Sequence, residues 1–231
     1  MPEIGLFEAI YSARSLRRLR PDPVPENLIT KILDAAIRAP SAGNSQNWSF
    51  VVVRDPELRR KLGVIYRKAA DTIGAFYAAR GRPEHMSERE FGHMMASGTY
   101  LWDHIGDAPV LLVPCGAPHV LPPAASLSPE VREKLSDAAA CGPRIEAASI
   151  YPAIENIILA CRALGLATLI TTNHMLYEDE VRDLLGIPRD VKTYALMPIG
   201  YPVNKFGPVI RKPVDEVAHA DRWGNPWADK T

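Results

Sequence analysis

The stretch between residues 39 and 48, called the amide bend below, constrains the fold of this chain more than any other. It reads Ala39-Pro40-Ser41-Ala42-Gly43-Asn44-Ser45-Gln46-Asn47-Trp48 and lies between a helix with regularly spaced apolar residues and an apolar strand. A helix cannot continue through Pro40 without losing a hydrogen bond, so the chain must turn here. Small residues at such a turn let backbone N–H groups approach a ligand closely.

Three uncharged amide side chains in this bend add further hydrogen-bonding groups. Asn44, Gln46 and Asn47 each offer both donors and acceptors. This chemistry suits a polar planar heterocycle better than a metal ion or a bare phosphate. The same residue types also form ordinary helix-to-strand turns, so composition alone leaves both interpretations open.

The composition predicts an ordinary globular protein. The 231 residues are 47% hydrophobic, and 27 basic residues balance 27 acidic ones, so nothing favours nucleic-acid binding. A chain of this length can bury roughly 70% of its unfolded surface in one domain. Three widely spaced cysteines, no basic leader and no apolar run of 18 residues lead us to expect a cytoplasmic protein without a membrane segment.

Apolar periodicity predicts helices alternating with a few strands. The expected helices cover residues 4–12, 25–37, 55–80, 87–104, 146–164 and 178–185, with a shorter one after Pro129. The expected strands cover residues 48–53, 108–115, 166–172 and 191–200. Gly142-Pro143 is expected to close the segment before the longest helix, and the tail from residue 205 has no periodicity.

The chain lacks the usual motifs of acid–base, nucleophilic or metal catalysis. It contains no G-x-S-x-G, G-x-x-x-x-G-K, G-x-G-x-x-G or H-E-x-x-H, and its six histidines do not pair at i, i+4 spacing. We therefore expect no metal site. An enzyme without such a set takes its chemistry from a bound cofactor.

A basic stretch upstream of the amide bend carries the second motif. Residues 14–20, called the arginine segment below, hold four arginines within seven residues and begin Arg14-Ser15-Leu16-Arg17. This motif, followed after one helix by Pro40-Ser41-x-x-Asn44-x-Gln46-x-Trp48, resembles the nitroreductase family, whose members bind flavin mononucleotide (FMN). Asn47 stands where the family often has proline and Leu19 where it often has an aromatic residue, but neither change removes a polar contact.

The resemblance implies a single α+β domain over residues 1–231, with a mixed, mainly antiparallel sheet flanked by helices. It also implies a homodimer with flavin sites at the subunit interface. Residues 81–145 are then a helical cover over the substrate region, and residues 205–231 a C-terminal arm that crosses to the partner subunit. Trp223 and Trp227 would bury apolar area in that way, although the tail can equally fold back on its own subunit.

The resemblance also implies which residues bind the flavin. The expected phosphate contacts are Arg14, Ser15, Arg17 and Arg211. The expected contacts to the ring and the ribityl chain are Pro40, Ser41, Ala42, Gly43 and Asn44. The expected contacts at the opposite ring edge, near N5, are Ile170, Thr171 and Thr172. In this hypothesis the arginine segment and the amide bend close around opposite ends of one flavin.

Each assignment has a simpler alternative. The arginine segment can be a solvated basic turn, which explains Arg18 and Arg20 well, and threonines at a strand end are common β-formers. The expected substrate pocket lies on the helix after Ser87 and consists of Phe91, Met95, Tyr100 and Trp102, with Met94 nearby. These apolar residues can equally be plain core.

The resemblance implies a two-step reaction in which NADH or NADPH reduces the flavin and an electron-poor small molecule, such as a nitroaromatic compound, then takes the electrons in pairs. Other flavin chemistry on the same fold stays open: enone or quinone reduction, dehalogenation, or flavin breakdown. A flavin-binding protein without catalysis and a flavin-free dimer are further alternatives. The identity of the acceptor is not readable from these residues.

Overall fold

The computed structural model describes residues 4–118, 122–137 and 141–227. Parts of two predicted regions therefore lie outside the described residues: 119–121 and 138–140 of the expected cover, and 228–231 of the expected arm. None of the described helices is both long enough and apolar enough to cross a membrane.

The sheet is organised around one central strand. It contains β1 (Trp48–Val53), β2 (Val110–Gly116), β3 (Lys192–Thr193) and β4 (Met197–Ile199), and β2 pairs with each of the other three. All these pairings are antiparallel, so no parallel pair of a mixed sheet occurs among the described strands. The prediction of a continuous apolar central strand at residues 108–115 is confirmed.

The predicted strand over residues 191–200 is interrupted by a one-residue bulge. Thr193 pairs with Cys115, whereas Met197 pairs with Leu112, so four steps on one strand oppose three on the other. An extra residue of this kind bends the strand and leaves part of it unpaired with its neighbour. Within the bulge Leu196 pairs instead with Thr171: the Thr171 N–H lies 3.2 Å from the Leu196 oxygen, and the Leu196 N–H lies 2.8 Å from the Thr171 oxygen.

The prediction of a regular strand over residues 166–172 is wrong. This stretch makes only two isolated bridges, Ala167 with Gly200 and Thr171 with Leu196. Its β-branched residues favour extended backbone, but β2 is already paired along both of its edges. The stretch therefore lines the end of the sheet as an irregular segment.

The helices follow the predicted order with two corrections. They are α1 (Leu6–Ser12), α2 (Glu26–Ala36), α3 (Pro56–Lys68), α4 (Ala70–Arg80), α5 (Glu88–His104), α6 (Pro129–Asp137), α7 (Gly142–Ala163) and α8 (Glu178–Leu185). The predicted helix 55–80 is two helices, because the Ala69 N–H bonds to Tyr66 rather than one residue further back. Gly142-Pro143 opens α7 instead of closing the segment before it, since proline is well tolerated in a first turn.

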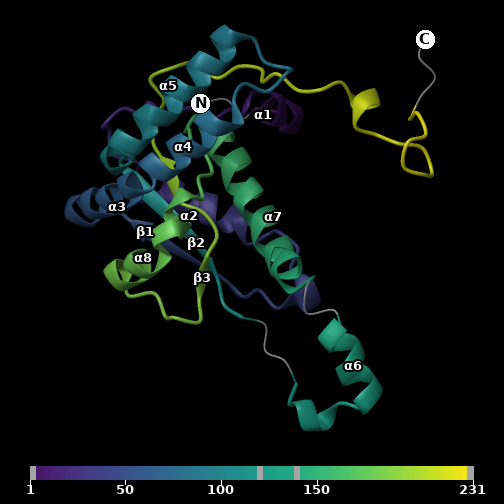
Figure 1. Cartoon of the computed structure of the whole chain (residues 1–231). Helices are drawn as coiled ribbons and strands as arrows, with labels where there is room; N and C mark the ends of the chain where they lie inside the picture. The colour runs from purple at the N-terminus through teal and green to yellow at the C-terminus, as the bar shows by residue number, and fades with distance from the viewer. Residues whose placement is uncertain (1–3, 119–121, 138–140, 228–231) are drawn as a thin grey trace.

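Two apolar cores cover the two faces of the sheet. Alternate residues of β2 belong to different cores: Val110 and Leu112 pack with α2 and α7, and Leu111 and Val113 pack with α3, α5 and α8. This follows from the period of two along a strand. The layers are visible in Figure 1, with β2 between the two groups of helices.

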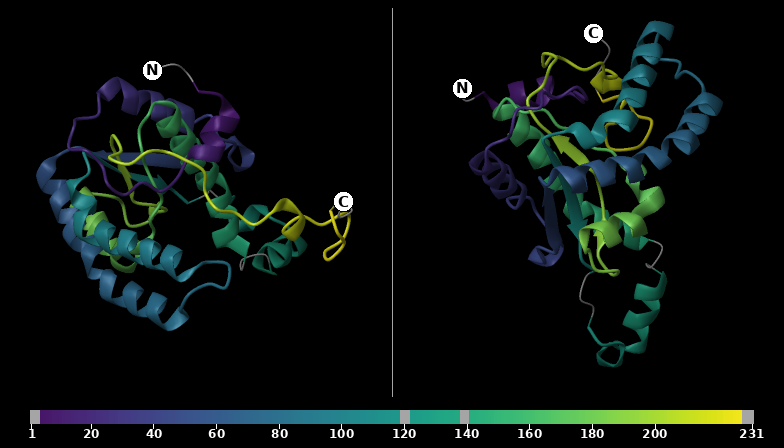
Figure 2. Two further views of the ribbon diagram at one scale, coloured as in Figure 1. Left: turned by 90° about the horizontal axis from the view of Figure 1, so that it is seen from above. Right: turned by 90° about the vertical axis from the view of Figure 1, so that its left-hand side faces the viewer.

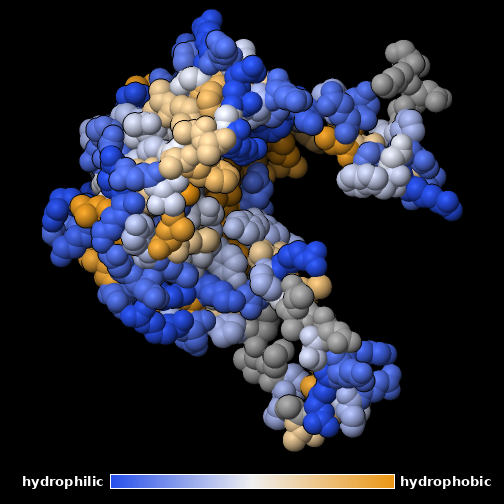
Figure 3. Space-filling model, viewed as in Figure 1, coloured by the Kyte–Doolittle hydropathy of each residue, from blue (hydrophilic) through white to orange (hydrophobic). Residues whose placement is uncertain are grey.

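Two segments project from this body. Figures 1 and 2 show α6 and the chain after residue 205 extending away from it, and Figure 3 shows them on either side of an open concavity. Trp223 is 92% exposed and Trp227 60% exposed, so these two residues are not packed on their own subunit as the alternative supposed, whereas the start of the tail contacts the body through Phe206, over whose ring Arg162 lies at 4.4 Å. The only regular element in the described tail is a short 3₁₀ turn, Val214–Glu216.

Two helical glycines differ in what a side chain would meet, which gives a matched stability test. A Cβ at Gly63 of α3 would lie 3.2 Å from the Gly106 backbone, whereas one at Gly92 of α5 would meet nothing within 4 Å. We expect Gly63→Ala to lower the free energy of unfolding by about 1–2 kcal/mol through overpacking. Gly92→Ala should raise it by up to about 1 kcal/mol through helix propensity. Urea unfolding followed by circular dichroism measures both, and equal shifts would contradict the close crossing of α3 with residue 106.

Candidate functional site

The arginine segment is fixed against a second stretch from the far end of the chain. The Arg20 N–H donates to the Tyr201 oxygen at 2.8 Å, the Val203 N–H donates to the Arg18 oxygen at 3.0 Å, and Leu19 bridges to Pro202. This pairing sets the direction of the side chains between α1 and α2. Arg17 consequently points toward α5.

Arg17 is a part-buried cation that makes no ion pair with an acidic residue within the described chain. Its Nη1 donates to Ser97 Oγ at 3.1 Å, and its Nε is buried with no hydrogen-bond acceptor among the described residues. Burial lowers the pKa of the guanidinium, and the charged forms of Tyr66 and Tyr77, not of carboxylates, act to raise it. A desolvated positive charge in this state favours an anionic ligand.

Arg17 lies on the wall of a cavity of about 230 Å³ between α3, α4, α5 and the segment after β-bridge residue Ala167. Ile170, Thr171 and Thr172 line the same cavity, as does Trp102, so the structure brings five of the predicted site residues together. We call residues 170–173 the cavity turn. The remaining lining residues were not predicted: Tyr66, Tyr77, Gly98, Leu101, Leu169 and Asn173.

A second, larger cavity of about 640 Å³ lies on the other side of Arg17. Arg14, Ser15 and Arg18 line it together with Glu90, His93, Met94 and Ser97 of α5. Arg18, which the sequence suggested to be only solvated, contributes to this wall and stacks over the Tyr100 ring at 4.0 Å. Tyr100 is thus covered by a guanidinium and does not face either of these two cavities.

Three other predicted residues lie apart from both cavities. Phe91 and Met95 are half-buried on α5 and line neither of them. Arg211 lies in the projecting C-terminal segment, where its Nη1 donates to the neighbouring Ile210 oxygen at 2.8 Å. Within the described chain Arg211 lines neither of the cavities that Arg14 and Arg17 line.

The amide bend has an unusual backbone and uses its own polar groups. Gly43, Asn44 and Gln46 all have positive φ angles, a region that residues other than glycine adopt rarely. The Ser41 hydroxyl accepts the Gln46 N–H at 3.1 Å, and the Gln46 amide donates to Asn44 Oδ1 at 3.1 Å. These bonds hold an exposed loop in a defined shape, which is typical of a binding surface.

The amide bend and the arginine segment lie at different positions along α7. The Ala42 N–H donates to Ser149 Oγ, whereas Ser12, two residues before Arg14, accepts a bond from Arg162. Ser149 and Arg162 are thirteen positions apart on α7, which corresponds to about 20 Å along the helix. No residue of the amide bend lines either cavity beside Arg17, so within the described part of one chain the two segments do not share these cavities, in contrast to the expectation that they enclose one flavin.

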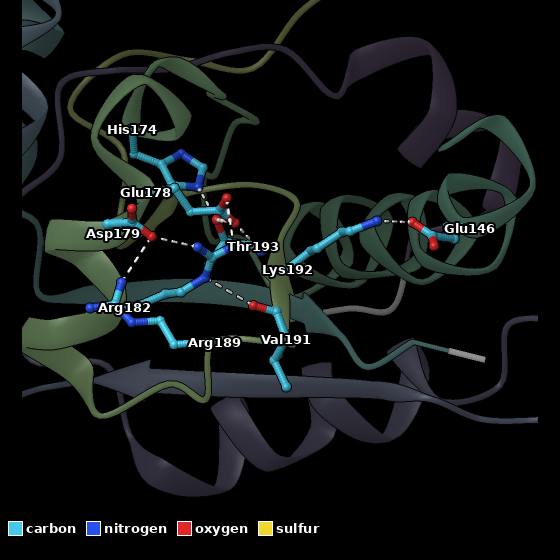
Figure 4. A network of polar contacts seen from close by, with 9 residues as sticks. All are labelled: Glu146, His174, Glu178, Asp179, Arg182, Arg189, Val191, Lys192 and Thr193. Atoms are coloured by element: carbon cyan, nitrogen blue, oxygen red, sulfur yellow. Dashed lines mark hydrogen bonds and ion pairs between the residues drawn. The ribbon is translucent and has the colours of Figure 1, made fainter. Parts of the chain in front are cut away.

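A polar network anchors the chain just after the cavity turn (Figure 4). The His174 Nε2 lies 3.1 Å from Thr193 Oγ1, and Glu178 accepts bonds from the Thr193 N–H and hydroxyl at 2.7 and 2.8 Å. Burial lowers the pKa of His174 to about 4, so this imidazole is neutral at pH 7. Among the described residues, no group of three His, Cys, Asp or Glu side chains is arranged to hold a metal ion.

Comparison with known proteins agrees with this architecture. Residues 10–201 match the Nitroreductase family. An NADH dehydrogenase of Thermus thermophilus is 31% identical, over 94% of this chain and 96% of the relative.

Two solved structures share the fold at lower identity. A BluB-like flavoprotein from Clostridium difficile 630 superimposes with a TM-score of 0.69 at 23% identity, covering 95% of this chain and all (100%) of that one. An oxidized iodotyrosine deiodinase bound to FMN and 3-iodo-L-tyrosine has a TM-score of 0.65 at 20% identity, covering 94% of this chain and 99% of that one. These matches confirm the resemblance seen in the two motifs and give the chain a nitroreductase-like α+β fold. The protein therefore belongs to the nitroreductase family.

Proposed function

We propose that this protein is an FMN-dependent oxidoreductase that uses NADH or NADPH to reduce an electron-poor small molecule, with nitroaromatic compounds as the first candidates. The observation that carries the proposal is the unpartnered Arg17 Nε beside the cavity turn. A flavin whose ring becomes anionic on reduction supplies the missing negative charge. The family membership of the chain supports the same chemistry.

The residues on both sides of Arg17 fit this cofactor. Arg14 and Ser15 would hold the phosphate through charge-assisted hydrogen bonds, because they line the larger and more polar cavity. Arg17 would serve the ring edge and the phosphate side, since it lines both cavities. When bound, FMN accepts a hydride from the nicotinamide and passes an electron pair to the acceptor.

The proposal includes a homodimer that completes the site. A second subunit would supply the amide bend, with its contacts from Pro40 to Asn44, because no residue of that bend lines either cavity beside Arg17 within the described part of a single chain. Apolar side chains remain exposed on α1, on α7 and along the C-terminal arm, and a partner would cover them. They include Phe7, Tyr11, Ile145, Tyr151, Ile210 and Trp223.

The same partner accounts for the projecting segments. The open concavity between α6 and the C-terminal arm has room for another molecule (Figure 3). In the proposed dimer the arm, including Arg211, crosses to the partner, and α5 and α6 cover the substrate region. We further propose a cytoplasmic location, since Cys115, Cys141 and Cys161 are all free thiols.

Reductive dehalogenation is the second candidate reaction. The structural similarity to a deiodinase bound to FMN and 3-iodo-L-tyrosine supports it, although at 20% identity that similarity concerns the fold. Both reactions require the same reduced cofactor and differ in the acceptor. The acceptor therefore has to be assigned by turnover.

Removal of the two arginines tests the cofactor assignment. We expect Arg14→Ala with Arg17→Ala to weaken FMN binding at least about 100-fold, because two charge-assisted bonds are lost. The purified variant should lack the visible absorption of flavin. Arg20→Ala is the control, since Arg20 already pairs with Asp22 at 3.4 Å and lines neither cavity. A double variant that keeps its full flavin content would refute the assignment.

Turnover without oxygen tests the choice of acceptor. We expect the FMN-loaded protein to oxidise NADH or NADPH when a nitroarene is added, with kcat/KM at least tenfold higher than for an enone, a quinone or a halophenol. Stopped-flow absorbance follows flavin reduction and reoxidation separately. Faster reoxidation by a halophenol would transfer the assignment to dehalogenation. Absence of any reduction by either nicotinamide would indicate flavin binding without catalysis.

A further inference from the structure

A buried tyrosine in the cavity wall forms hydrogen bonds with the residues on both sides of Thr172. Tyr66 of α3 is 1% exposed, and its hydroxyl lies 2.8 Å from Thr171 Oγ1. The Tyr66 hydroxyl oxygen also accepts a hydrogen bond from Asn173 Nδ2 at 3.4 Å. Tyr66 therefore contacts the residue before Thr172 and the residue after it, and holds both from one point.

Thr172 offers hydrogen-bonding groups of the cavity turn that remain available to a ligand. Within the described chain, neither its N–H nor its hydroxyl has a hydrogen-bond partner, while its carbonyl accepts the Met175 N–H at 3.0 Å. Its φ of −117° and ψ of 1° lie in a sparsely allowed region of backbone conformation. The neighbours of Thr172 must therefore maintain this conformation.

We propose that Tyr66 is a positioning residue of the flavin site: its hydroxyl fixes Thr171 and Asn173 and thereby orients Thr172 toward the bound ring. The inference rests on the proposed function, because that function supplies the flavin ring that Thr172 would face. The two hydrogen bonds of the Tyr66 hydroxyl, called the tyrosine clamp below, lie within one subunit. Tyr66 acts through its two neighbours on the cavity turn and needs no contact with the reacting atoms.

The rest of the turn is anchored without Tyr66. On one side the Thr171 backbone pairs with Leu196, and on the other His174 bonds to Thr193. Loss of the tyrosine hydroxyl therefore releases the middle of the turn and leaves its ends attached. Burial also raises the pKa of Tyr66, so the hydroxyl keeps its proton at pH 7 and can serve as donor or acceptor.

Tyr66→Phe tests the role in the holoenzyme, because phenylalanine fills the same volume and lacks only the hydroxyl. We expect the dissociation constant for FMN, measured by fluorescence titration of the apoprotein, to rise about threefold to tenfold. Preorganised donors favour the more negative, reduced ring. The two-electron midpoint potential of bound FMN should therefore fall by about 15–30 mV, which is a threefold to tenfold loss of preference for the reduced form.

Tyr177→Phe is the matched control. Tyr177 packs against the same core as Tyr66 and its hydroxyl donates to the Lys68 oxygen at 3.4 Å, but it lines neither cavity. We expect this variant to keep the wild-type FMN affinity within twofold and the wild-type potential within about 10 mV. Equal shifts in both variants would overturn the assignment, since they would report a general effect of losing a tyrosine hydroxyl from this core.

Hydrogen exchange of the apoprotein separates the clamp from the cofactor. The Met175 amide is bonded to the Thr172 carbonyl in the middle of the turn, and we expect it to exchange at least about threefold faster in Tyr66→Phe than in wild type. An unchanged rate overturns the clamp whether or not FMN binds. Faster exchange with unchanged FMN affinity and potential overturns the positioning role. Failure of the wild-type apoprotein to bind FMN at all would instead refute the proposed function.

Discussion

The pairing of β2 with three antiparallel neighbours is the constraint on which the rest of the structure depends. Since its side chains alternate between the two cores, β2 fixes α2 and α7 on one face and α3, α5 and α8 on the other. The one-residue bulge opposite β2 then frees Leu196 to pair with Thr171. The position of the cavity turn is therefore a consequence of sheet register.

The fold determines whether the charge of Arg17 is exposed to water or partly desolvated. An exposed arginine gains little from a partner and loses little without one. Arg17 is held by the pairing of residues 18–20 with residues 201–203, and its Nε is removed from water without a replacement acceptor. The fold thus maintains a partly desolvated cation next to a turn with free hydrogen-bonding groups. A planar ligand with negative charge satisfies both.

Local sequence signals predicted the elements that depend on local chemistry. The predicted helix over residues 87–104 begins at the capping box of Ser87 and Glu90, and the predicted helix over residues 178–185 ends at Gly186, which is in a left-handed conformation. The strand at residues 48–53 also has the predicted bounds. In each case the residues within a few positions determine the outcome, so the sequence contains the necessary information.

Features that depend on distant pairing were not predictable in the same way. The bulge at Leu196 and the irregular course of residues 166–172 arise from competition for the edges of β2, which no local pattern records. Tyr66 lies on the apolar face of α3 and looks like ordinary core, and only its distance to Thr171 shows a polar role. Asn173 directly follows the predicted Thr172, so extending that motif by one residue would have found it.

The length of α7 links the fold to the proposed assembly. The helix carries Ser149, which binds the amide bend, and Arg162, which binds the end of α1, and these points lie about 20 Å apart along the helix. Neither cavity beside Arg17 is lined by a residue of the amide bend. If both motifs contact one flavin in these cavities, as their joint resemblance to the family implies, the amide bend would come from another copy of the chain. In the proposed dimer, the helix that separates the two half-sites within a subunit would be the reason that the site lies between subunits.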